Sequence, residues 1–154
     1  MVKVWGIGSS TPHFTLEEFT FSQTASRKGI DNTPDKDALQ NLKFLAERME
    51  DVRELLGTAI HISSGYRCLE LNTILGSKPS SQHTKGLACD FKSSRYGNPS
   101  DIVFAIVSSD IHYDQSILEY HNPNNPDSGW VHISFSQNNP RKEALIINKN
   151  GTTL

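Results

Sequence analysis

A long amphipathic stretch from Asp35 to Leu56 limits the folds that this chain can adopt. Its apolar residues recur at intervals of three and four, at Leu39, Leu42, Leu45, Ala46, Met49, Val52, Leu55 and Leu56. This spacing places them along one face of an α-helix, and the Gly57 that follows is typical of a helix end. The fold must therefore bury one face of this helix against other elements.

Short segments after this helix have the pattern of β-strands. They are rich in β-branched and aromatic residues and are bounded by turn residues, over 59–64, 86–91, 116–120, 130–135 and a final edge strand at 144–148. Helices that come first, followed by a mostly antiparallel sheet, predict an α+β fold in which the N-terminal helices pack on the sheet.

Three shorter helices and three loops complete the prediction. A helix over 13–19 has Thr15 as its N-cap with Glu18 three residues later, which is the pattern of a capping box. Further helices are expected over 67–75 and over 100–109, the latter with Ser100 as N-cap. The segments 26–34, 77–85 and 121–129 are expected to be loops, the last one a long hairpin loop.

Composition narrows the class of protein. A chain of 154 residues with 36% hydrophobic content fits a single domain over residues 1–154. A net charge of −2 and a pI near 6.3 argue against nucleic-acid and membrane partners. Cys68 and Cys89 belong to no CxxC or CxxH pair, so we expect reduced packing residues. A monomer is the default expectation.

A candidate metal centre comes from three residues in two segments. Asp90 lies on the expected strand 86–91, beside the small Ala88, and His83 lies at the end of the polar loop before it. His132 lies on the strand 130–135, whose alternation separates it from Val131 and Ile133. Two imidazoles and one carboxylate suit catalytic zinc and leave a position for water. A structural role for each residue stays open on spacing alone.

Three sequence blocks resemble those of a known family. Ser64-Gly-Tyr-Arg67, then Ser81-Gln-His-Thr-Lys-Gly-Leu-Ala-Cys-Asp-Phe91, then Trp130-Val-His-Ile-Ser134 are similar to the signature blocks of the D-alanyl-D-alanine zinc metallopeptidases. This family includes D-Ala-D-Ala carboxypeptidases and phage L-alanyl-D-glutamate endopeptidases, and the hedgehog signalling domain shares its fold. The likeness runs over about residues 13–136 and is strongest to the small phage and prophage branch, through Phe14–Phe19 and Gly29–Pro34.

The resemblance implies a function and a set of site residues. It implies that His83, Asp90 and His132 bind Zn²⁺ and that the substrate is a peptidoglycan stem peptide. Arg67 would bind the substrate or its oxyanion, the alternative being an ordinary surface salt bridge. Ser81, Gln82 and Tyr66 are expected to bind substrate, although Ser81 and Gln82 equally suit a turn.

The general base is less directly indicated. Many members of the resembled family have a glutamate three residues before the last histidine ligand, and Gly129 occupies that position here. Glu119, on the strand before the long hairpin loop, is our first candidate, because the loop would be an insertion that leaves it across from His132. Asp127 is the second candidate, although an aspartate in a Pro-Asp-Ser-Gly turn is also ordinary turn chemistry. His121, at the hairpin edge, is a further candidate for contact with substrate.

Two hypotheses about function follow. The first is a zinc peptidase that cuts peptidoglycan stem peptides, as a phage-type endolysin endopeptidase or a D-Ala-D-Ala carboxypeptidase. The alternative is a catalytically silent, zinc-containing cell-wall or protein binding module of the same fold, which the glycine at position 129 keeps open.

The N-terminus bears on where the protein acts. Residues 1–10 contain no continuous apolar run and no obvious cleavage site, so no signal peptide is expected. We therefore expect a protein made in the cytoplasm that reaches the cell wall after lysis or as part of a phage particle.

Overall fold

The computed structural model describes residues 3–4 and 10–153. The chain divides into two compact units, the first made of Met1–Glu50 and Ser64–Cys89 and the second of Asp51–Ser63 and Asp90–Leu154. The single-domain organisation stays a prediction. Of the N-terminal stretch on which the targeting expectation rests, residues 1–2 and 5–9 lie outside the described residues.

The first unit is mainly helical. It contains the short antiparallel pair β1 (Lys3–Val4) and β2 (Ser10–Thr11), the helices α1 (Leu16–Thr20), α2 (Gln23–Lys28) and α4 (Leu69–Ile74), the 3₁₀ helix η1 (Gln82–Lys85), and most of α3 (Lys36–Leu56). Its largest fully buried side chains come from the segment before α1, from α1 itself, and from α3 and α4: Phe14, Phe19, Leu42, Leu45, Met49 and Leu71.

The local signals of this unit explain its helices. The predicted capping box at Thr15 and Glu18 is confirmed. The long helix is confirmed as α3, and Gly57 after it has a left-handed φ of +69°. Leu55, expected on the buried face, is 39% exposed.

The predicted loop over 26–34 was wrong in its first part. Ser26 to Lys28 belong to α2, because the Ser22 hydroxyl caps its start and Gly29 ends it in the left-handed conformation.

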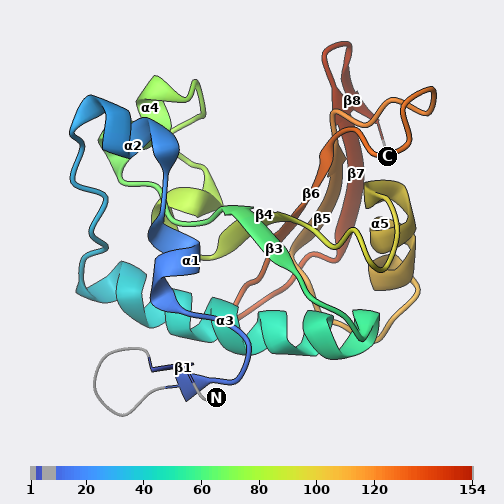
Figure 1. The fold of residues 1–154 in the computed structure, drawn as a ribbon, viewed down its shortest axis with the longest axis horizontal. Helices are drawn as coiled ribbons and strands as arrows, with labels where there is room; N and C mark the ends of the chain where they lie inside the picture. The colour runs from blue at the N-terminus through green and yellow to red at the C-terminus, as the bar shows by residue number, and fades with distance from the viewer. Residues whose placement is uncertain (1–2, 5–9, 154) are drawn as a thin grey trace. The chain divides into compact units, whose positions relative to one another are not determined.

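The second unit holds most of a sheet. The strand order is β3 (His61–Ser64), β4 (Ala88–Lys92), β6 (Trp130–Ser134), β5 (Gln115–Glu119), β7 (Glu143–Asn148) and β8 (Gly151–Thr153). Helix α5 (Pro99–Val107) lies against β5 and β6 (Figure 1). Ile102 and Ile106 of α5 and Val131 and Ile133 of β6 are fully buried. The α+β class is confirmed.

Two predictions in this unit need correction. Residues 144–148 do not form an edge strand, because β7 pairs in parallel with β5 on one side and antiparallel with β8 on the other. The N-cap of α5 is Asn98 instead of Ser100, since Asn98 and Asp101 form a capping box around Pro99, a residue well suited to the first helical turn.

Among the described residues, no helix is long and apolar enough to cross a membrane.

Candidate metal centre

Three polar side chains of the second unit meet on neighbouring strands. Asp90 on β4 and His132 on β6 are buried, and Asp90 Oδ1 lies 3.0 Å from His132 Nδ1. Glu119 on β5 is also close, with Oε1 3.6 Å from the same nitrogen. Two carboxylates therefore converge on one ring nitrogen, an arrangement that suits a cation or a shared proton.

The sheet register accounts for this convergence. His132 pairs directly with Ile117 in the antiparallel β5–β6 ladder, and Glu119 pairs with Trp130. Directly paired residues and their second neighbours share one face of a sheet, so Glu119 is the diagonal neighbour of His132. Asp90 comes from the strand on the other side of β6.

His83 is fixed by its own part of the chain. It lies in η1, where Ser81 caps the first turn, and its side chain is buried. Its Nδ1 lies 2.7 Å from the Gly65 carbonyl oxygen, which can only accept, so Nδ1 carries the proton and donates. This hydrogen bond leaves Nε2 with a lone pair, the arrangement found for histidines that bind metal through that atom.

These residues make up the candidate ligand set. Among the described residues, His83, Asp90 and His132 are all buried and each offers a possible ligand atom within 4.8 Å of the others. Two imidazole nitrogens and one carboxylate oxygen are a donor set suited to catalytic zinc, and the tautomer of His83 fits this use.

Arg67 lies in the turn before α4 and is half-buried. Its guanidinium donates from Nε to the Ser64 hydroxyl at 3.2 Å and from an Nη atom to the Ser77 hydroxyl at 3.0 Å. Its backbone N–H donates to the His83 carbonyl oxygen. Neighbouring residues of the same two loops, 64–67 and 77–83, therefore hold both His83 and the arginine.

The other predicted substrate residues lie around the same loops. Tyr66 is buried, and burial raises the pKa of its phenol, with smaller contributions from Asp35 and Cys68. The Ser81 hydroxyl accepts a hydrogen bond from the His83 N–H, which is the turn role that the sequence left open. Gln82 is half-buried in η1.

The two candidates for the general base lie in different surroundings. Glu119 has 18% of its side chain exposed and lies beside His132. Asp127 is exposed in the loop between β5 and β6, and its carbonyl oxygen accepts a hydrogen bond from Lys92. Geometry therefore favours Glu119 for work at the centre.

The backbone conformation explains why a glycine occupies position 129. Its φ is +78°, and an added Cβ would collide with the Glu119 carbonyl oxygen and lie 2.7 Å from the His121 nitrogen. A glutamate at this position would be strained and obstructed. The hairpin therefore disfavours a glutamate three residues before His132, where many members of the resembled family have one. The glutamate near His132 in this chain is Glu119, on β5.

The sequence matches the peptidase M15 family over residues 12–134. The chain belongs to this family. M15 peptidases are metallopeptidases of the D-Ala-D-Ala zinc peptidase type, which agrees with the buried group of His83, Asp90 and His132. No curated protein matches this M15 chain.

Asn32 is a residue of this M15 peptidase whose role the sequence did not reveal. Its amide donates to the carbonyl oxygens of Thr20 and Tyr66, and its Oδ1 accepts from the Cys68 N–H at 2.8 Å. It therefore clamps both sides of Arg67. The only signal in the sequence was its place in the Gly29–Pro34 segment, which carries no indication of three tertiary hydrogen bonds.

We expect Asn32→Ala to lower the free energy of unfolding by about 2 kcal/mol, because it removes the hydrogen-bond partner of several partly buried backbone groups. Asn41→Ala is the matched control, since the Asn41 amide donates one exposed hydrogen bond, to the Lys85 carbonyl oxygen. The control should lose less than about 1 kcal/mol. Urea denaturation followed by circular dichroism measures both values, and equal losses would contradict the role of Asn32 as a clamp.

Proposed function

We propose that this M15 peptidase hydrolyses amide bonds in the stem peptides of peptidoglycan and that Glu119 is its general base. The observation that carries the proposal is the placement of the Glu119 carboxylate 3.6 Å from His132 Nδ1, on the sheet face that also presents Asp90. A silent binding module would not need a second carboxylate at that nitrogen.

His83, Asp90 and His132 are the residues that would hold the zinc ion. When bound, zinc supplies a Lewis acid that lowers the pKa of water and polarises a carbonyl group. The Gly65 carbonyl keeps His83 in the tautomer that this requires.

The chain's own groups would handle the proton and the charge. Glu119 would accept a proton from the attacking water and then give it to the amine that leaves. The guanidinium of Arg67, held by Ser64 and Ser77, suits the negative charge that develops on the carbonyl oxygen. Tyr66, Ser81 and Gln82 remain candidates for substrate contact.

The cellular role belongs to the same proposal. We favour a phage-type endolysin endopeptidase over a D-Ala-D-Ala carboxypeptidase, because of the resemblance of the Phe14–Phe19 and Gly29–Pro34 segments to the small phage and prophage branch. Such an enzyme acts as a monomer on cell wall, after lysis or from a phage particle.

The test is digestion of purified peptidoglycan with and without a zinc chelator, with new chain ends identified by mass spectrometry. We expect new ends within the stem peptide that disappear with chelator and return with added zinc. Released D-alanine would assign a carboxypeptidase, and new ends on L-alanine and D-glutamate an endopeptidase. Intact peptidoglycan in the presence of zinc-loaded protein would favour the silent binding module.

A further inference from the structure

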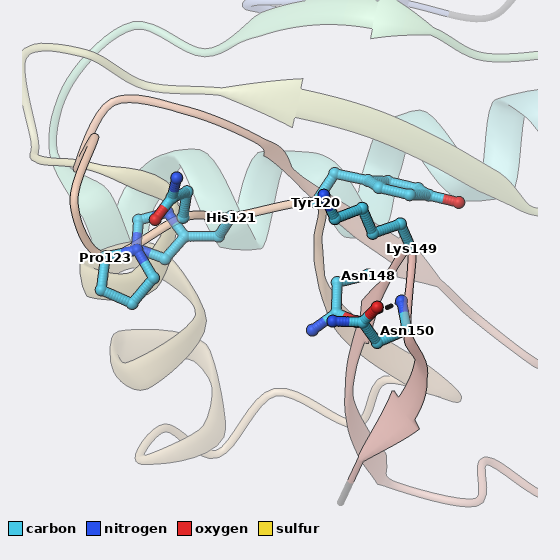
Figure 2. Close-up of a pocket in the computed structure, with 7 residues that line it drawn as sticks. Tyr120, His121, Pro123, Asn148, Lys149 and Asn150 are labelled. Atoms are coloured by element: carbon cyan, nitrogen blue, oxygen red, sulfur yellow. Dashed lines mark hydrogen bonds between the residues drawn. The ribbon is translucent and has the colours of Figure 1, made fainter.

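A pocket opens where β5 leads into the long hairpin. Tyr120, His121, Asn122 and Pro123 line it from the start of the hairpin, and Asn148, Lys149 and Asn150 from the turn between β7 and β8. Its volume is about 380 Å³. Figure 2 shows His121 and Pro123 on one side and Asn148, Lys149 and Asn150 on the other. The pocket begins one residue after the proposed general base, Glu119.

Tyr120 forms a fixed wall of this pocket. Its φ is +54°, a left-handed conformation that is uncommon for a residue with a bulky side chain. The backbone is held there by a hydrogen bond from the Tyr120 N–H to the Ile147 carbonyl oxygen at 2.7 Å. Tyr120 is 48% exposed, and its ring packs against Trp130, with centroids 5.3 Å apart. Strained backbone of this kind is concentrated at functional sites.

The polar lining favours an anion. Lys149 is exposed, and no acidic residue is among the described residues that line the pocket. The side-chain oxygens of Asn122 and Asn148 already accept hydrogen bonds from the Asn124 and Asn150 N–H groups. Their amide NH₂ groups therefore remain as donors.

His121 adds an imidazole to this lining. Its Nδ1 donates to the Ser128 carbonyl oxygen at 3.0 Å, which fixes the ring and leaves Nε2 for a ligand. A cation and amide donors beside an aromatic wall match a carboxylate carried on an aliphatic chain.

We propose that this pocket is a substrate subsite. It binds a carboxylate that the peptide carries at a distance from the bond that is cut. The inference rests on the proposed function, since it makes the pocket an extension of the same site along β5. Lys149 would pair with the carboxylate, the amides of Asn122 and Asn148 would donate to it, and Tyr120 would pack on the aliphatic part of the same residue.

Binding can be measured apart from hydrolysis. Two synthetic stem pentapeptides serve as probes, one with free carboxylates and one with every carboxylate amidated. The chain contains two tryptophans, so Trp5→Phe leaves Trp130 as the fluorescent reporter beside Tyr120. Titrations are made in the zinc-loaded Glu119→Gln protein, so that a bound peptide is not cleaved.

Two lysine variants decide the question. Lys149→Met removes the charge and keeps the aliphatic length, and Lys36→Met removes the same charge from an exposed position of α3 that does not line the pocket. We expect Lys149→Met to raise the Kd of the free-carboxylate peptide about tenfold, as a lost charge-assisted hydrogen bond would. The Kd of the amidated peptide should stay within about twofold in both variants, and Lys36→Met should change neither.

Failure of the pocket and failure of the proposed function can be told apart. Equal Kd values for the two peptides, or equal effects of the two lysine variants, would overturn the subsite even if zinc-dependent hydrolysis is found. A selective loss in Lys149→Met supports the subsite even if no peptide bond is cut, and the peptidase proposal would then fail alone.

Discussion

Replacing Glu119 with glutamine should lower kcat/KM for stem-peptide hydrolysis by a factor of about 10²–10⁴, the usual contribution of a general acid–base group. Glutamine keeps the size of the side chain but neither accepts the proton of the attacking water nor delivers one to the leaving amine. The effect should fall mainly on kcat, because the substrate contacts proposed for Arg67 and the Tyr120 pocket are untouched.

The matched control for this prediction is Asp127→Asn. Asp127 is exposed in the hairpin and contributes its backbone carbonyl, instead of its carboxylate, to the hydrogen bond with Lys92. We expect less than about a threefold change in kcat/KM for this variant, since a carboxylate exposed in the hairpin is not placed to accept a proton from the attacking water. A large loss in Asp127→Asn together with full activity in Glu119→Gln would reverse the assignment of the base.

Removing a ligand should abolish both zinc binding and hydrolysis. Losing even a hydrogen-bond partner of a metal ligand typically weakens affinity 10- to 100-fold, so the loss of a ligand itself from His132→Ala should cost more than about 100-fold. After dialysis against zinc-free buffer, the zinc content should fall from about one ion per chain to near zero. Inductively coupled plasma mass spectrometry measures this directly.

Two further variants keep the ligand test interpretable. Asp90→Asn preserves the shape of a buried side chain and should also lose zinc, which guards against a folding defect in His132→Ala. His121→Ala changes the same residue type outside the ligand group, where Nδ1 bonds the Ser128 carbonyl oxygen, and it should retain zinc. Normal zinc content in His132→Ala and Asp90→Asn would refute this metal centre.

The sequence was informative where a local pattern has only one stable outcome. The period of apolar residues in Asp35–Leu56 requires a helix, and Thr15 with Glu18 caps a helix start, so these elements were predicted correctly. Glu119 was placed across from His132 by treating the hairpin as an insertion relative to the resembled family, and the β5–β6 register makes the two residues diagonal neighbours. Their proximity could be argued beforehand because the hairpin connects these two strands directly.

The features that the sequence did not predict correctly are set by contacts between residues far apart in the chain. Nothing local to residues 144–148 shows that β8 will cover their outer side or that they run parallel to β5. Asn98 and Ser100 are both good capping residues, and the choice depends on where Pro99 allows the first turn to begin. Likewise Asn32 bonds residues far along the chain, and the Tyr120 pocket joins two separate turns.

The proposed zinc peptidase activity is tested by a zinc titration of the metal-free protein, with the release of new amino groups from peptidoglycan followed at each addition. We expect hydrolysis to be absent without zinc, to rise in proportion to added metal and to saturate near one equivalent per chain. Hydrolysis that is unchanged by complete removal of zinc, or a fully zinc-loaded protein that releases no new amino groups, would show that this M15 chain is not a zinc peptidase of peptidoglycan.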